Sequence, residues 1–150
     1  MKRKIGVLIL LILLTCGCSK KSGTLTCTNE TKSENNTYTS TLESKISYKD
    51  GYVTTVTTKE EIVAKTDEQA KEFKSILESY YIEYNQVEGF TNTIEQKNKT
   101  VTSLTTIDYK NIDTNKLIKL DEGNKSIIKN GKVSIKDIKK SFVEQGASCK

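Results

Sequence analysis

The chain of 150 residues contains no histidine, no proline and no tryptophan. Without histidine it lacks the usual acid–base group of neutral pH, the residue that most often activates a nucleophile, and the commonest zinc ligand. Carboxylates are therefore the remaining acid–base candidates. The chain is rich in lysine, asparagine, threonine and isoleucine, a bias typical of AT-rich bacterial genomes, so we attach no chemistry to the absence of proline or tryptophan.

An apolar run stands near the N-terminus. Three basic residues, Lys2, Arg3 and Lys4, precede the run over residues 5–14, which only Gly6 interrupts. A run of this length is too short to cross a bilayer as a helix, but it matches the core of a signal peptide. We therefore predict a signal peptide over residues 1–17.

Two cysteines follow this run, and one of them is expected to carry a lipid. Gly17 supplies the small residue that a lipoprotein peptidase needs before Cys18, whereas Thr15 fits poorly before Cys16. We predict lipid attachment at Cys18, a tether over residues 18–23 and a location on the extracytoplasmic face of the cell membrane. An ordinary secretory signal with chance cysteines is the alternative.

Loss of the predicted signal shortens the chain to 133 residues, a size typical of one domain, which we place at residues 24–150. Three basic residues leave with it, so the net charge falls from +5 to +2. With so small a net charge, we expect no nucleic-acid partner. Lys20 and Lys21 follow the lipid directly, where they can meet anionic headgroups.

Cysteine is scarce, with four in the chain. Cys16 leaves with the signal and Cys18 takes the lipid, so Cys27 and Cys149 remain. In an oxidising exported compartment these two most simply form one disulfide. Two independent thiols are the alternative.

Alternating polar and apolar residues predict two β-hairpins. The first joins residues 39–48 and 52–63 through a turn at Asp50-Gly51, with Tyr52, Val56 and Ile62 expected on one face. The second joins residues 91–97 and 100–109, and a preceding strand is expected over residues 24–31. A further turn is predicted at residues 130–131.

Helices are predicted after each hairpin. Thr66 caps a helix with apolar residues at three- and four-residue steps that ends near Asn85. A short helix is expected over residues 113–118, a loop over residues 121–124, and a last helix from Ser134 to Gly146. The predicted fold class is α+β, an antiparallel sheet built from two β-hairpins with helices packed on one face.

Tyrosines and threonines are the candidate binding groups. Tyr80, Tyr81 and Tyr84 are candidates for a surface that stacks on sugar or peptide rings, but their helical spacing favours a structural role. In that role Tyr80 and Tyr84 are buried against the sheet and Tyr81 lies nearer solvent. The threonine-rich strands offer a polar recognition face, or simply the wet side of a sheet. An unpaired sheet edge would permit peptide capture by strand addition.

The carboxylates form adjacent pairs, which point to opposite faces when they lie in a strand. These pairs are Glu60-Glu61, Asp67-Glu68 and Asp121-Glu122. A glycosidase needs two carboxyl groups that face each other across a cleft, which a sequence does not reveal. Residues 121–124 hold too few ligands for a calcium loop. We expect no catalytic residues, no cofactor and no metal.

Several turns, caps and core positions occur in a distinctive order, at residues 48–53, 66–70, 84–85, 89–90 and 106–110, with Asp113 and Leu117. This order resembles the YehR-like family of small bacterial lipoproteins. The resemblance implies an exported, lipid-anchored α+β domain of undetermined activity, and it supplies no catalytic residues. Cys27 and Cys149 are absent from some members, so the predicted disulfide rests on the cysteine count alone.

The expected function is therefore that of a non-enzymatic domain, anchored to the membrane through Cys18, which binds an envelope protein or a small ligand. A small carboxylate-based envelope hydrolase is one alternative. A solute-binding accessory lipoprotein is another, although 133 residues are few for the two lobes of such proteins.

Overall fold

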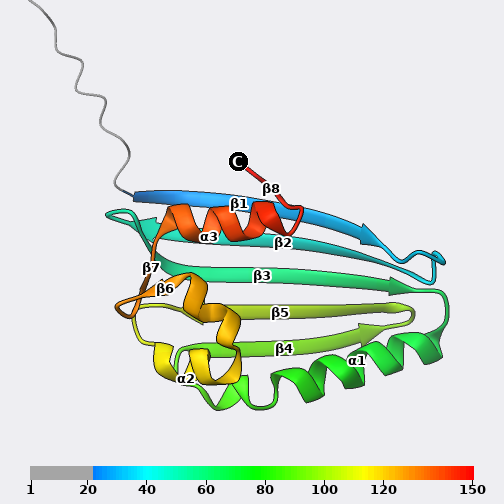
Figure 1. Ribbon diagram of the computed structural model, residues 1–150. Coiled ribbons are helices and arrows are strands. Elements are labelled where there is room, and N and C mark those ends of the chain that lie inside the picture. Colours follow the sequence, from blue (N-terminus) through cyan, green and yellow to red (C-terminus); the bar gives the residue numbers. More distant parts are fainter. Residues whose placement is uncertain (1–21) are drawn as a thin grey trace, which may run out of the picture.

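A six-stranded antiparallel sheet runs through residues 22–150, the part of the chain that the computed structural model describes (Figure 1). The predicted signal peptide and Cys18 lie outside the described residues. The strands are β1 (Ser22–Lys32), β2 (Tyr38–Lys49), β3 (Tyr52–Ala64), β4 (Phe90–Lys97), β5 (Thr100–Asp108), β6 (Ile128–Lys129), β7 (Lys132–Val133) and β8 (Ser148–Cys149). The helices are α1 (Asp67–Tyr81), α2 (Thr114–Leu120) and α3 (Ile135–Glu144), with 3-10 turns η1 (Tyr84–Gln86) and η2 (Glu122–Ser126).

The strand order is β4-β5-β3-β2-β1-β8, and β6 and β7 form a separate two-stranded hairpin. Both predicted long hairpins are present, and β1 pairs with β2 from Ser22 to Lys32. Asp50 and Gly51 have φ of 52° and 82°. These positive values suit the tight turn that the Asp-Gly pair predicts.

Side-chain hydrogen bonds to the backbone mark where the helices begin. Thr66 accepts a hydrogen bond from the backbone N–H of Gln69, and the Gln69 side chain accepts one from the N–H of Lys65. Helix α1 ends at Tyr81, before the predicted end near Asn85, because the chain passes into the 3-10 turn η1. The predicted loop at residues 121–124 is also wrong, since Asp121 caps η2 by accepting from the N–H of Gly123.

One face of the sheet is buried beneath the helices, and the other face, which we call the open face, is not. The expected placement of Tyr52 with Val56 and Ile62 is wrong, since Tyr52 is 47% exposed. The register shifts between Ser47 and Tyr48, so an extra residue in β3 turns Val53 inward in place of Tyr52. Beyond such a bulge, the residues that face inward are those that a strict two-residue alternation would place on the other face.

The buried face holds two apolar clusters. The smaller contains Ile62, Ala64, Ala70 and Val101 and lies beneath α1. The larger is built around Ile46, Val56, Leu117, Val133 and Ile138, and it joins β1–β3 to α2 and α3. Because α1 and the C-terminal helices cover different parts of the sheet, a seam is left between them.

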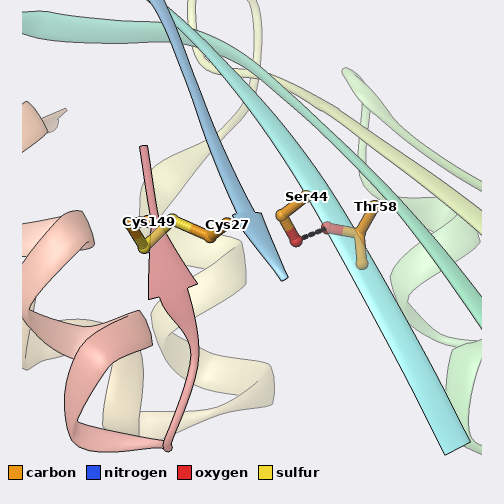
Figure 2. The surroundings of a disulfide bond; sticks show 4 residues. All are labelled: Cys27, Ser44, Thr58 and Cys149. Atoms are coloured by element: carbon orange, nitrogen blue, oxygen red, sulfur yellow. Dashed lines mark hydrogen bonds between the residues drawn. A yellow bond between two sulfur atoms is a disulfide. The ribbon is translucent and has the colours of Figure 1, made fainter. Parts of the chain in front are cut away.

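A disulfide joins Cys27 to Cys149, as the cysteine count predicts, and Figure 2 shows it beside the strand pair β1–β8. The two cysteines are directly paired in the antiparallel register, and Cys27 is fully buried. Strand β8 was not predicted. Backbone hydrogen bonds in both directions between Thr26 and Lys150 extend its pairing with β1.

None of the helices within residues 22–150 is both long enough and apolar enough to span a bilayer.

Candidate functional site

A row of side chains crosses the buried face of the sheet along the seam between the two clusters. The strand registers place Cys27, Ser44, Thr58, Thr105 and Asn92 opposite one another on β1, β2, β3, β5 and β4. Apolar residues are the usual choice for such inward positions. Four of these five are polar, so the seam departs from ordinary core composition.

Hydrogen bonds between the side chains stabilise this row. The hydroxyls of Ser44 and Thr58 lie 2.8 Å apart (Figure 2). The amide of Asn92 donates to both Ser103 and Thr105, each at 2.8 Å. Every partner is thereby satisfied, which is what allows hydroxyl groups to be buried at low cost.

A pocket of about 220 Å³ opens above Thr58 and Thr105, and we call it the tyrosine pocket. Its walls come from the end of α1, from η1 and the start of β4, and from α2 and η2. The remaining lining residues are Tyr80, Tyr81, Tyr84, Phe90, Ile107, Tyr109, Leu117, Asp121 and Asn124. A concave site with aromatic walls and a few polar groups is the usual form of a small-ligand site.

The aromatic wall is held rigid by ring contacts. Tyr84 packs on Phe90 with ring centroids 5.3 Å apart, and Tyr81 stacks on Phe90 at 5.9 Å. Tyr84 is buried as predicted, but the other two placements are wrong, because Tyr80 is 55% exposed and Tyr81 is half-buried. Leu77 and Tyr81 are one helical turn apart and lie on the inward face of α1, which ends at Tyr81. Tyr80 lies beside this face, at the rim of the pocket.

Burial raises the pKa of three of the pocket's tyrosines, Tyr81, Tyr84 and Tyr109, so their hydroxyls are neutral at physiological pH. Burial raises the pKa of Tyr109 to about 12. Burial also raises the pKa of Tyr84, and the neighbouring Tyr80 adds to the shift. For Tyr81, burial raises the pKa more than a hydrogen bond with Thr105 lowers it. Neutral hydroxyls act as hydrogen-bond donors, not as general bases.

The rim of the pocket is acidic. A larger hollow of about 530 Å³ adjoins the pocket and shares Tyr80, Tyr84 and Asp121 with it. Glu83 also lines this hollow. No lysine lines either space. Carboxylates without a basic partner repel anions, so these surroundings suit an uncharged or cationic ligand.

The open face carries a second hollow, of about 350 Å³, across β1, β2 and β3. Its carboxylates Glu30, Glu43 and Glu61 each form an ion pair with a lysine two residues away, at 3.4, 3.2 and 3.1 Å. These exposed pairs contribute little to stability. Because lysines already occupy the three carboxylates, we regard this hollow as a solvated sheet surface.

The predicted threonine group divides between the two faces. The open face carries Thr55, Thr57, Thr102 and Thr106, which alternate with inward-facing residues. Thr58 and Thr105 instead form the pocket floor. Thr54 lies at the bulge, where its hydroxyl donates to the carbonyl of Ser47.

The predicted carboxylate pairs do not come together. Glu60 lies on the buried face and accepts a hydrogen bond from Ser40, while Glu61 lies on the open face. Asp67 and Glu68 occupy the first turn of α1. Across residues 22–150 no three side chains of the His, Cys, Asp or Glu type gather as a metal site.

The sheet edges are partly covered. At the β4 edge the side chain of Asn85 accepts a hydrogen bond of 2.8 Å from the backbone N–H of Asn92. At the β1 edge, β8 pairs with Cys27 and Thr28. Both arrangements occupy backbone groups that a peptide would need for strand addition.

These features define a single α+β domain, with an antiparallel sheet covered on one face by helices and a pocket in the seam between them. The family described as Domain of unknown function (DUF8824) matches residues 18–150, and the chain belongs to it. No curated protein matches the chain.

Two solved structures share the fold. A protein from Streptococcus pneumoniae TIGR4 is 16% identical with a TM-score of 0.57, covering 100% of this chain and 98% of its own. The YehR protein of E. coli is also 16% identical with a TM-score of 0.57, covering 81% of this chain and 88% of its own. The likeness to YehR agrees with the predicted resemblance at the level of the fold.

Three residues that line the pocket, Phe90, Tyr109 and Asn124, were not proposed as binding groups from the sequence. The sequence did contain one signal for the floor of the pocket. Thr58 and Thr105 each lie two residues from an inward-facing apolar residue of the same strand, Val56 and Ile107, so the alternation places them on the buried face. The sequence contains no such signal for the pocket walls, because the residues that form them come from segments far apart in the chain.

Proposed function

We propose that this chain is a lipid-anchored protein of the cell envelope that binds a small ligand in the tyrosine pocket without catalysis. The observation that carries the binding role is the pocket itself, which has an aromatic wall and the hydroxyls of Thr58 and Thr105 at its floor. Its size suits a single ring or a side chain of a partner. The acidic rim favours an uncharged or cationic group.

The anchoring part of the proposal rests on the sequence. The basic, apolar and small-residue regions occur in the order of a lipoprotein signal, with Gly17 before Cys18. Labelling cells with a fatty acid analogue tests it. We expect label on the native chain and its loss in Cys18→Ser. Persistent label on Cys18→Ser would contradict the anchor.

Tyrosine fluorescence tests the binding role, because the chain has no tryptophan to obscure it. The probes are N-acetylglucosamine, choline and benzoate, which are uncharged, cationic and anionic. We expect one or both of the first two to change the emission in a saturable way, and benzoate to have no effect. Saturation by benzoate alone, or by none of the three, would contradict the proposed ligand class.

A carboxylate-based hydrolase is the second candidate, since Asp121 and Glu83 line the same hollow. Asp121 is exposed and already accepts a backbone hydrogen bond at 2.8 Å. Because the Asp121 carboxylate is engaged as the cap of η2, the binding role is favoured. Turnover of a glycoside substrate that Asp121→Asn abolishes would support the hydrolase.

A further inference from the structure

The charge of the chain is unevenly distributed along its length. Residues 22–108 hold nine lysines and 14 acidic residues, whereas residues 109–150 hold ten lysines and five acidic residues. The C-terminal third, which forms α2, β6, β7 and α3, is therefore basic. The sheet and α1 are acidic.

The β6–β7 hairpin and the start of α3 lie at the end of the sheet where β1 begins and β2 turns into β3 (Figure 1). Ser22, the first residue of β1, pairs with Lys49, which opens the β2–β3 turn. The N–H of Ile135 donates to the carbonyl of Gly51 in that turn, and Tyr52 bridges to Ser134. The β6–β7 hairpin, in which Lys129 pairs with Lys132, enters α3 at the same place.

We call this surface the tether end and define it by Lys49, Tyr52, Lys129, Lys132 and Lys136. All five side chains are exposed. The ammonium of Lys132 lies 5.1 Å from the centre of the Tyr52 ring. Such a neighbouring pair of an exposed tyrosine and a lysine is typical of groups that sit at a membrane–water interface.

The lysines of the tether end are not neutralised by ion pairs. Within the described part of the chain, the salt bridges involve Lys32, Lys45, Lys59, Lys74, Lys125 and Lys140. Two carboxylates share this end, Asp50 in the turn and Asp137 in the first turn of α3. Four lysines against two carboxylates leave the surface positive.

We propose that the tether end binds the anionic surface of the bilayer and so holds the domain in a fixed orientation. Cys18 precedes Ser22 by four residues, which span at most about 14 Å when extended. A lipid at Cys18 would therefore hold this end near the headgroups, and Lys20 and Lys21 add to its charge. The orientation rests on the proposed anchor, whereas the affinity for anionic lipid does not.

Vesicle binding by residues 19–150 tests this affinity. The segment lacks Cys18, and it contains the whole sheet, both apolar clusters and the disulfide, so it comprises the folding unit. We expect binding to vesicles that contain phosphatidylglycerol and none to pure phosphatidylcholine. Each lysine near an anionic surface strengthens binding about fivefold. The variant Lys129→Gln/Lys132→Gln/Lys136→Gln is thus expected to bind about one hundredfold more weakly at low salt.

The matched control is Lys71→Gln/Lys97→Gln/Lys99→Gln, which removes the same charge from α1 and the β4–β5 turn. We expect it to weaken binding by less than about threefold. Absent binding of the native segment, or an equal loss in both variants, would overturn the proposal. Neither result bears on fatty acid labelling at Cys18 or on ligand fluorescence, so failure here is distinguishable from failure of the proposed function.

A single tryptophan reports the orientation, since the chain has none of its own. With brominated phosphatidylglycerol in the vesicles, we expect quenching of the emission of Tyr52→Trp. Ile76→Trp, on an exposed position of α1, is expected to stay unquenched. Equal quenching of the two would contradict the orientation.

Discussion

Thr58 and Thr105 lie directly opposite each other on β3 and β5, and both contribute to the floor of the tyrosine pocket. Their chain neighbours Thr57 and Thr106 are also paired, but on the open face. Paired threonines therefore occur on both faces of the sheet. One pair lies at the floor of a pocket with aromatic walls, and the other lies on the open face.

Removal of the Thr105 hydroxyl weakens the seam. In Thr105→Val the amide of Asn92 loses one of its two side-chain acceptors and keeps Ser103. We expect the free energy of unfolding to fall by about 1 kcal/mol, the typical net value of such a bond. Urea denaturation measures it. Thr106→Val is the control, expected within about 0.5 kcal/mol of the native chain, and an equal loss in both would contradict the role of the seam.

The disulfide constrains the unfolded chain. Cys27 and Cys149 are 122 residues apart, and in the chain-entropy model closing such a loop contributes about 4 to 5 kcal/mol. We expect Cys27→Ala/Cys149→Ala to lose a stability of this order, read from the urea midpoint under oxidising conditions. Addition of a reductant should destabilise the native chain and leave the double variant unchanged. A loss below about 1 kcal/mol would contradict this account.

Ile46 lies on β2 between Leu25 of β1 and Val56 of β3, and it is fully buried in the larger cluster. Ile46→Ala is expected to cost about 2 to 5 kcal/mol, because it removes buried methyl groups and leaves a cavity. Ile76, which is 63% exposed on α1, provides the control. Ile76→Ala should change stability by less than about 0.5 kcal/mol. Thermal unfolding followed by circular dichroism separates the two.

The buried tyrosines make stability fall at alkaline pH. The folded state holds the pKa of Tyr109 at about 12, above the ordinary 10, so the unfolded state releases its proton first. The contribution is complete below pH 10 and is lost as the pH rises to 12. For Tyr109 it amounts to about 2 to 3 kcal/mol.

Urea midpoints measured between pH 9 and 12 test this dependence. Tyr109→Phe should flatten the decline above pH 10, because it removes the hydroxyl whose pKa burial raises. An unchanged slope in Tyr109→Phe would contradict the burial of this hydroxyl.

The sequence was sufficient for elements whose signals are local. The Asp50-Gly51 turn, the Thr66 cap and the Ser134 cap each lie within a few residues of the structure they produce. The faces of β3 were predicted only in part, because a bulge changes the phase and turns Val53 inward. Periodicity has no means of detecting an inserted residue.

The site was less accessible from the sequence. Tyr80, Tyr81 and Tyr84 were chosen correctly as aromatic candidates, but their burial depends on where α1 ends. The pocket also needs Asp121 and Asn124, which reach it only because α2 and η2 fold back over the sheet. Proximity of this kind is set by packing and not by spacing.

The central claim is that the tyrosine pocket binds a small uncharged or cationic ligand. The most direct test is the methyl chemical shifts of threonine in NMR titrations with N-acetylglucosamine and with choline. We predict saturable shifts at Thr58 and Thr105 for at least one of these probes, and none at Thr57 and Thr106. Shifts confined to the open-face pair, or no saturable shift at Thr58 and Thr105 with either probe, would contradict the account.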